Sequence, residues 1–215
     1  MLCFLGNSHA SYHLREAAKQ RGLHVITEME KAHVVFISED TPTDDSGVRD
    51  VRPIRALIAK AAMTGAQLVL TSQVEPGFTR SLGISNIFHQ AETLRIIDAE
   101  KRALHPEYIA VGGDATIGTH YANYLAVFQC PVLRMTWEEA EFSKIAVNMT
   151  LAAQVDNANR LAAVAERVGA KWDVVSEALK LDSRIGARSY LKPGRWQDSR
   201  HLLRDAVTLK VIERG

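Results

Sequence analysis

The sequence predicts an α/β protein in which a reduced, doubly wound sheet is followed by a long helix. Short apolar runs alternate with amphipathic helical patterns through residue 134, and this alternation is typical of a mostly parallel sheet covered by helices. A single helical pattern of about 30 residues then extends from Thr136 to Arg167. A chain of 215 residues is long enough for one full core with a helical extension.

The predicted strands are short apolar runs bounded by turn residues. They are Leu2–Leu5, Leu23–Ile26, Val34–Ser38, Gln67–Thr71, Ile109–Val111 and Val132–Leu133. Amphipathic helices are expected at Ala10–Gln20, Val51–Met63 and Gly118–Phe128. Only a short stretch, TEMEKA, precedes the third strand, whereas a parallel crossover takes about a dozen residues or more. The second strand is therefore expected at the edge of the sheet.

The long helix is predicted to begin at a capping box. In TWEE, the Thr136 side chain is placed to accept a first-turn N–H, and Glu139 is placed to reach back to the cap. Gly169 is the expected C-terminal stop, and a shorter helix is predicted at Trp172–Lys180. An irregular tail rich in Arg and Gly then leads to a last helical segment.

These elements divide the chain into three parts. We predict a sheet domain at 1–134, a helical dimerisation domain at 135–181 and an irregular tail with a terminal helix at 182–215. A helix of this length has more apolar surface than a reduced sheet can cover, so a homodimer through residues 136–167 is expected.

Composition and charge exclude several classes of protein. The formal net charge of +1 gives no electrostatic reason to expect a nucleic-acid or anionic-membrane partner. No apolar run approaches the roughly 20 residues of a membrane-spanning helix, and MLCFLG lacks the basic flank of a signal peptide. Cys3 and Cys130 lie in apolar runs, so we expect small core residues with free thiols, in a reducing compartment. We therefore expect a cytoplasmic protein, and we predict no metal site.

EFSKIAVNMTLAAQV places Lys144 and Asn148 one helical turn apart in an otherwise apolar run. A lysine is rarely buried without a partner, and burial lowers the pKa of a lysine towards values useful for proton transfer. Asn148 lies on the same face and is placed to hold a hydroxyl or carbonyl oxygen. The alternative is that Lys144 extends to a surface and Asn148 makes a structural hydrogen bond.

The first predicted strand is followed by a turn and a helix, an arrangement that suits a phosphate at a helix N-terminus. Against the dinucleotide fingerprint GxGxxG, the three glycine positions are Gly6, Ser8 and Ser11. Glu28 or Glu30 is a candidate for the acid that holds a ribose. An ordinary strand–turn–helix explains the same residues equally well.

Several stretches taken in order resemble the UDP-glucose/GDP-mannose 6-dehydrogenase family. They are ISEDTPTDDSGVRD, LTSQVEPGFTR, ETLRIIDAEKRALHPEYIAVG, EAEFSKIAVN, NRLAAVAERVGA and LDSRIG. TPT at Thr41–Thr43, with Gly47 downstream, resembles the strand-end motif before the family's cofactor loop. The helix with Lys144 and Asn148 resembles the family's central helix, and Arg184 matches the family's substrate-binding arginine.

The resemblance implies a Rossmann-like domain that binds NAD, and a small sugar-like ligand. Its implied catalytic residues are Lys144, Asn148, Asp205 and Glu92. Its implied cofactor residues are Gly6, Asn7, Ser8, Glu28, Thr41 and Gln73, and its implied substrate residues are Arg184 and His201.

The sequence also departs from the family. The family's catalytic cysteine lies in a glycine-rich loop, and in PGRWQDSRHLLRD the corresponding position, counted back from Asp205, holds His201. Gln73 replaces a threonine, and Ile96 replaces a second glutamate. Part of the family's nucleotide domain is expected to be missing before Thr41, as is the third, nucleotide-sugar-binding domain after the last helix.

These departures bear on the chemistry. The family oxidises a sugar alcohol twice, and the second oxidation passes through a covalent bond to the cysteine sulfur. An imidazole cannot take that role, so a complete four-electron oxidation is not expected. Three hypotheses remain: an NAD-linked oxidoreductase that performs a single oxidation, a catalytically inactive dimeric binding or scaffold relative, and a non-redox sugar-nucleotide enzyme that uses His201 as acid or base.

Overall fold

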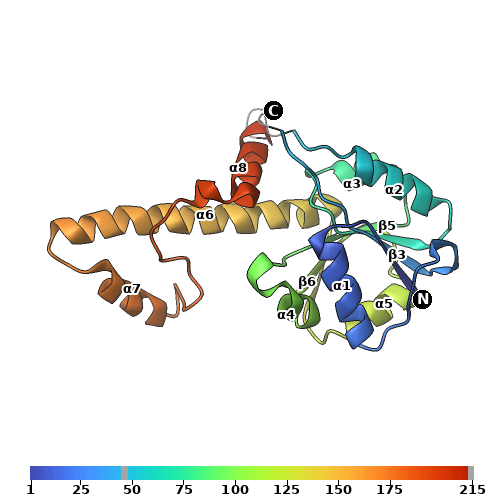
Figure 1. Ribbon diagram of the computed structural model, residues 1–215, viewed down its shortest axis with the longest axis horizontal. Helices are drawn as coiled ribbons and strands as arrows, with labels where there is room; N and C mark the ends of the chain where they lie inside the picture. Colours follow the sequence, from blue (N-terminus) through green and yellow to red (C-terminus); the bar gives the residue numbers. More distant parts are fainter. Residues whose placement is uncertain (45–47, 213–215) are drawn as a thin grey trace. The chain divides into compact units, whose positions relative to one another are not determined.

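The computed structural model describes residues 1–44 and 48–212 of the chain. The chain divides into two compact units, one from Met1 to Lys144 and the other from Ile145 onward. Helix α6 (Trp137–Arg167), the long helix labelled in Figure 1, contributes residues to both units. Below, the two are called unit 1 and unit 2.

Unit 1 is built on a seven-stranded sheet of order β2-β1-β3-β4-β5-β6-β7. The strands are β1 (Leu2–Leu5), β2 (Val25–Ile26), β3 (Val34–Ile37), β4 (Gln67–Leu70), β5 (Ile87–Ala91), β6 (Ile109–Gly112) and β7 (Val132–Met135). All neighbouring strands are parallel except β5 and β6, which are antiparallel. The predicted α/β class with a mostly parallel sheet is therefore confirmed.

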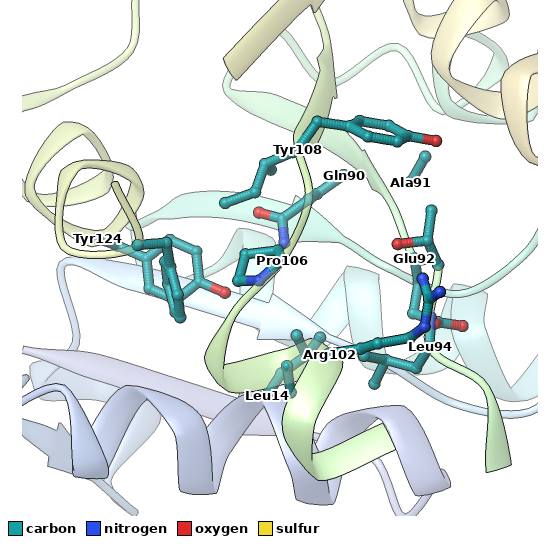
Figure 2. Close-up of a pocket in the computed structure, with 13 residues that line it drawn as sticks. Leu14, Gln90, Ala91, Glu92, Leu94, Arg102, Pro106, Tyr108 and Tyr124 are labelled. Carbon is teal, nitrogen blue, oxygen red and sulfur yellow. The ribbon is translucent and has the colours of Figure 1, made fainter. Parts of the chain in front are cut away.

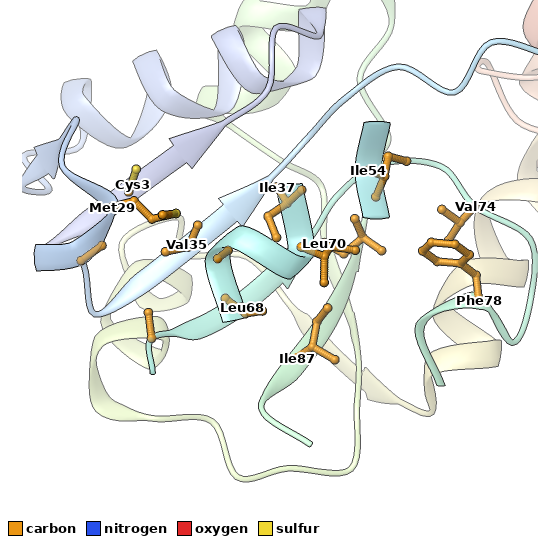
Figure 3. Packing of buried hydrophobic residues seen from close by; sticks show 14 of the residues in the cluster. Cys3, Met29, Val35, Ile37, Ile54, Leu68, Leu70, Val74, Phe78 and Ile87 are labelled. Atoms are coloured by element: carbon orange, nitrogen blue, oxygen red, sulfur yellow. The ribbon is translucent and has the colours of Figure 1, made fainter. Parts of the chain in front are cut away.

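Helices cover both faces of this sheet. They are α1 (His9–Gln20), α2 (Arg52–Ala62), α3 (Phe78–Ser81), α4 (Ala99–Leu104) and α5 (Thr119–Ala126). One apolar cluster joins β3, β4 and β5 to α2 and Phe78 of α3 (Figure 3). A second cluster packs the opposite sheet face against α1, α4 and α5. Because side chains alternate along a strand, β3 supplies Val35 and Ile37 to the first cluster and Val34 and Phe36 to the second.

The sequence missed some elements and misjudged the length of others. The second strand is shorter than predicted, with only two residues, and lies at the sheet edge as expected. Strand β5 was not predicted, because His89 and Gln90 interrupt its apolar pattern. Both side chains are nevertheless buried inside unit 1, and Gln90 accepts a hydrogen bond from the Tyr121 hydroxyl at 3.0 Å. The short helices α3 and α4 were also not predicted.

The predicted capping box at the start of α6 is present. The Thr136 N–H donates to a carboxylate oxygen of Glu139 at 2.7 Å, and the Glu139 N–H donates to the Thr136 hydroxyl at 3.3 Å. The nearby acid Glu141 is buried and accepts the backbone N–H groups of Gly77 at 2.6 Å and Thr79 at 2.8 Å. Glu141 thereby joins the first turns of α6 to the N-terminus of α3 within unit 1.

Unit 2 contains most of α6 together with α7 (Trp172–Leu181) and α8 (Arg200–Ile212). The predicted irregular tail between α7 and α8 is held to α6 by side-chain hydrogen bonds. Asn159 and the backbone of Gly194 exchange two of them, at 2.8 and 2.9 Å. The Trp196 indole N–H donates to Asp156 at 2.8 Å. Among the described residues, no helix is long and apolar enough to cross a bilayer.

Candidate functional site

The residues predicted to hold a cofactor gather at one edge of the sheet in unit 1. Gly6, Asn7 and Ser8 follow β1, Glu28 follows β2, Thr41 follows β3 and Gln73 follows β4. These four strands are parallel, so their carboxyl ends meet at the same edge. Ligands of open α/β sheets bind at this edge.

Gly6 begins the turn between β1 and α1 and has a φ of +97°. A Cβ atom at this position would lie 2.1 Å from the Ser38 carbonyl oxygen, closer than any side chain can approach. The glycine is therefore required by the contact between this turn and the end of β3. No bound phosphate is needed to explain it.

Ser8 takes the second glycine position of the fingerprint and caps α1. Its hydroxyl donates to the Ser38 carbonyl at 2.9 Å, lies 2.8 Å from the Ser38 hydroxyl and accepts the Ser11 N–H at 3.1 Å. Ser8 and Ser11 are both buried. One of the N–H donors at this helix N-terminus is therefore already satisfied by the chain itself.

Glu39, the second residue after β3, reaches the same turn. One of its carboxylate oxygens accepts the Asn7 N–H at 3.1 Å, and the other accepts the Asp40 N–H at 3.3 Å. The Glu39 carboxylate thus accepts the Asn7 N–H, and in a fingerprint turn this N–H would be available to bind the pyrophosphate of a dinucleotide. The residues present at this turn do not fit a pyrophosphate.

The remaining cofactor candidates are placed as follows. Thr41 is buried and donates from its hydroxyl to the Gln73 carbonyl at 3.0 Å, which joins the ends of β3 and β4. Glu28 is exposed, and its hydrogen bond with Lys31 lowers the pKa of its carboxyl. Gly47, part of the stretch after Thr41, lies outside the described residues.

Glu92 directly follows β5 and lines an open pocket in unit 1 (Figure 2). The pocket is bordered by Leu14 of α1, by Arg102 of α4 and by Tyr124 of α5. The Glu92 carboxylate accepts the Leu94 N–H within its own loop. Glu92 therefore lies at the same sheet edge as the cofactor candidates.

The two candidate residues of α6 lie one turn apart, where the two units meet in the chain. Lys144 is half-buried and is the last residue of unit 1. Asn148 is buried in unit 2, and its amide Nδ2 donates to Oδ2 of Asp205 in α8 at 2.6 Å. The Asp205 carboxylate is fully buried and has a second contact with the Arg204 guanidinium at 3.4 Å. The structure thus brings two of the predicted catalytic residues together.

The predicted substrate residues of unit 2 are on the surface. Arg184 is exposed and pairs with Asp182 at 2.7 Å, and this contact lowers the pKa of the Asp182 carboxyl. His201 is exposed in the first turn of α8. The chain has no cysteine after Cys130, so unit 2 contains no thiol. Among the described residues, no group of three His, Cys, Asp or Glu side chains is placed to hold a metal.

The segment that carries several of these residues is similar to a known family. A model described as the UDP-glucose/GDP-mannose dehydrogenase family, central domain, matches residues 138–210. The matched segment contains Lys144, Asn148, Arg184, His201 and Asp205. In this segment, the chain is similar to the central domain of the UDP-glucose/GDP-mannose dehydrogenase family.

Curated relatives of this family extend the similarity to most of the chain. The UDP-glucose 6-dehydrogenase of Bacillus subtilis is 27% identical over 179 residues, which cover 75% of this chain and 38% of the relative. The enzyme of Drosophila melanogaster is 29% identical over 189 residues, covering 75% of this chain and 40% of the relative. The chain thus spans about two fifths of the length of these dehydrogenases.

Solved structures show the same fold. A UDP-glucose dehydrogenase from Pyrobaculum islandicum superposes with a TM-score of 0.69 at 23% identity, covering 99% of this chain and 68% of that one. A GDP-mannose dehydrogenase from Pseudomonas aeruginosa gives a TM-score of 0.63 at 24% identity, covering 91% and 53%. The Rossmann-like sheet followed by a long helix is therefore the fold of nucleotide-sugar dehydrogenases.

The positions of three polar residues in unit 1 were not predicted from the sequence. Glu39 directly follows Ser38 at the end of a fully apolar strand, a position that indicates the sheet edge. Glu141 precedes the apolar part of α6, and nothing in its spacing indicates the contact with α3. His89 is buried in β5, and burial lowers the pKa of its imidazole to about 3, so it is neutral.

Proposed function

We propose that this protein is a dimeric, ligand-binding relative of the nucleotide-sugar dehydrogenases that does not catalyse their four-electron oxidation. The observation that carries the proposal is the location of the thiols. Cys3 lies in β1 and Cys130 lies two residues before β7, so both belong to unit 1. Asn148 and Asp205, the best-placed remnant of the family's site, belong to unit 2, which has no thiol to bond covalently to a sugar aldehyde.

Neither cysteine has the properties of a nucleophile. Burial raises the pKa of the Cys3 thiol, and the nearby Glu30 and Glu28 raise it further. Burial also raises the pKa of the Cys130 thiol. The thiolate is the reactive form of cysteine, so both groups are held in the unreactive form at neutral pH. Both are free thiols, which supports a reducing compartment such as the cytoplasm as the proposed location.

The ligand in this proposal is a sugar or nucleotide sugar. It is supported by the match of residues 138–210 to the family's central domain and by the buried Asn148–Asp205 hydrogen bond. The second amide N–H and the carbonyl of Asn148 remain suited to a ligand hydroxyl, because an amide has two donors and one acceptor oxygen. Asp205 fixes the orientation of that amide.

The proposed dimer is supported by apolar side chains exposed in unit 2. Val147 and Val164 of α6 are each about two fifths exposed, at 39%. Val174 and Leu181 of α7 are exposed as well. Side chains of this kind are usually covered in a stable assembly, and a second copy of the chain through α6 is the partner that we propose.

A single two-electron oxidation is the second candidate, and the Asn148–Asp205 pair favours it. The first oxidation of an alcohol needs a base for the hydroxyl proton and a donor that orients the oxygen. Lys144 and Asn148 are one turn apart and suit these two roles. This candidate also needs a hydride acceptor, which in the family is NAD.

Turnover assays separate the two candidates. The protein is incubated with UDP-glucose and millimolar NAD, NADH is followed by absorbance, and products are identified by mass spectrometry. We expect no NADH, together with saturable UDP-glucose binding in calorimetry, and we expect the Lys144→Met variant to remain folded. One NADH per sugar with an aldehyde product, lost in Lys144→Ala, would establish the second candidate instead. Two NADH per sugar with an acid product would contradict both.

A further inference from the structure

We propose that the Glu39 carboxylate occupies the anion-binding position of the β1–α1 turn and excludes the pyrophosphate of a dinucleotide from it. The proposal concerns unit 1 alone and does not depend on the chemistry of unit 2. It states why a chain with the fold of a dinucleotide-binding protein would not bind the dinucleotide.

The position of Glu39 is fixed from three sides. Its carboxylate accepts the N–H groups of Asn7 at 3.1 Å and Asp40 at 3.3 Å. Its own backbone N–H donates to the Ser72 hydroxyl, beyond the end of β4, at 2.8 Å. A carboxylate held by two backbone N–H groups has the environment of a bound anion. The chain therefore supplies its own anion to this turn.

The turn has little capacity for a second anion. The Ser11 N–H is taken by the Ser8 hydroxyl, and the Ser8 hydroxyl itself donates to the Ser38 carbonyl. The glycine at the second fingerprint position lets the backbone approach the pyrophosphate closely. The side chain of Ser8 prevents that approach here. Displacing Glu39 would leave its carboxylate beside the incoming phosphates.

Charge at this sheet edge acts in the same direction. Asp40 directly follows Glu39, Glu75 lies in the segment after β4, and Glu92 directly follows β5. A pyrophosphate carries two negative charges, and like charges a few ångströms apart repel each other strongly where water is partly excluded. The Glu39 carboxylate, which lies on the Asn7 N–H, therefore disfavours a pyrophosphate at the β1–α1 turn.

Binding of NADH to Glu39 variants tests this directly. NADH fluorescence is titrated up to millimolar concentration with the full-length protein, Glu39→Gln and Glu39→Ala. Glu39→Gln removes the charge and keeps an acceptor for the Asn7 N–H, whereas Glu39→Ala vacates that N–H. The matched control is Asp40→Asn, which removes the neighbouring charge, since Asp40 contacts the Glu39 carboxylate through its backbone N–H.

We expect no saturable NADH binding by the unmodified protein or by Asp40→Asn. Glu39→Gln and Glu39→Ala should each show saturable binding at low salt, with a Kd at least about tenfold below the highest NADH concentration at which Asp40→Asn shows none. The gain should shrink as salt is added, because salt screens repulsion between exposed charges. Adenosine, which lacks the pyrophosphate, should not distinguish the variants.

Two results would overturn the proposal. One is saturable, micromolar NADH binding by the unmodified protein. The other is folded Glu39 variants, verified by circular dichroism, that bind NADH no better than Asp40→Asn. Neither result bears on the missing thiol of unit 2. The proposed function would be contradicted by a different observation, turnover of UDP-glucose, so the failure of one proposal can be told from the failure of the other.

Discussion

Asn148 donates a 2.6 Å hydrogen bond to Asp205, and this bond joins the middle of α6 to α8 across 57 positions of sequence. Both side chains are buried. Losing the donor leaves a buried carboxyl group with fewer hydrogen-bond partners. The pair thus joins two of the predicted catalytic residues and is a structural link within unit 2.

Asn148→Ala should therefore lower the stability of unit 2. The Asp205 carboxylate would keep Arg204 as a partner but lose the 2.6 Å hydrogen bond from Asn148, at a cost of about 1–3 kcal/mol. Urea denaturation followed by tryptophan fluorescence measures this, since Trp172 and Trp196 lie in unit 2. Asn157→Ala removes an exposed asparagine of the same helix and should change stability by no more than about 0.5 kcal/mol. Equal effects of the two substitutions would contradict the assigned role.

Glu141 should make the stability of unit 1 depend on pH. Burial raises the pKa of its carboxyl above the ordinary 4.5, although the N–H groups of Thr79 and Gly77 partly offset this effect. The folded state then holds the proton at pH values where the unfolded chain has released it. The stabilisation from this group is complete below about 4.5 and is lost as pH rises through the folded-state pKa.

The measurement is the free energy of unfolding of the unmodified protein and of Glu141→Gln between about pH 4 and pH 7. The amide introduced by Glu141→Gln cannot titrate, so the advantage of the unmodified protein should decrease as pH rises. The NH2 group of the introduced amide cannot accept a hydrogen bond, so one of the two backbone N–H donors loses its partner. The Glu141→Gln variant is therefore expected to be about 1–3 kcal/mol less stable than the unmodified protein even at neutral pH. An advantage that grows with pH would show that the hydrogen bonds outweigh burial.

Gly6→Ala should destabilise unit 1 far more than a comparable change at Gly22. Both glycines have positive φ, at +97° and +76°, but of these two only Gly6 has a group that a Cβ atom would meet, the Ser38 carbonyl at 2.1 Å. Gly22→Ala should cost about 1–2 kcal/mol from backbone strain alone. Thermal denaturation of the two variants checks this, and similar melting temperatures would rule out the close approach between the β1–α1 turn and β3.

The proposed dimer is tested by placing charge on the exposed apolar part of α6. Sedimentation at micromolar concentration should show a dimer for the unmodified protein and a monomer for the double variant Val147→Glu with Val164→Glu, because burying an unpaired carboxylate is costly. Thr150→Glu adds a charge at an exposed polar position of the same helix and serves as the control. A monomeric unmodified protein would end this proposal.

The fold was largely predictable from local pattern, and the site only in part. The capping box at Thr136 and Glu139 was readable because both partners lie within one turn of each other. Strand β5 was not, because His89 and Gln90 interrupt its apolar pattern and their burial depends on their neighbours in the sheet. Spacing placed Asn148 beside Lys144, but the bond from Asn148 to Asp205 depends on tertiary packing.

The contact between Glu39 and the β1–α1 turn could not be predicted from the sequence. The family resemblance points to Thr41, two positions later. The dinucleotide fingerprint, in turn, concerns only the glycine positions of the β1–α1 turn. The structure shows that the turn is also contacted by a carboxylate from the end of β3. A long-range contact of this kind, between residues 7 and 39, leaves no periodic or compositional trace in the sequence.

Strand β3 has a consequence for how such a protein can diverge. All four of its residues, Val34 to Ile37, are fully enclosed, since the sheet is covered on both faces. A polar or charged substitution within the strand would cost several kcal/mol, whereas the residues just beyond its carboxyl end can acquire charge without disturbing the core. The residues of the strand stabilise the core, whereas the residues of the loop that follows it contact ligands. A chain of this architecture can therefore lose the chemistry of an ancestral enzyme while its fold is kept.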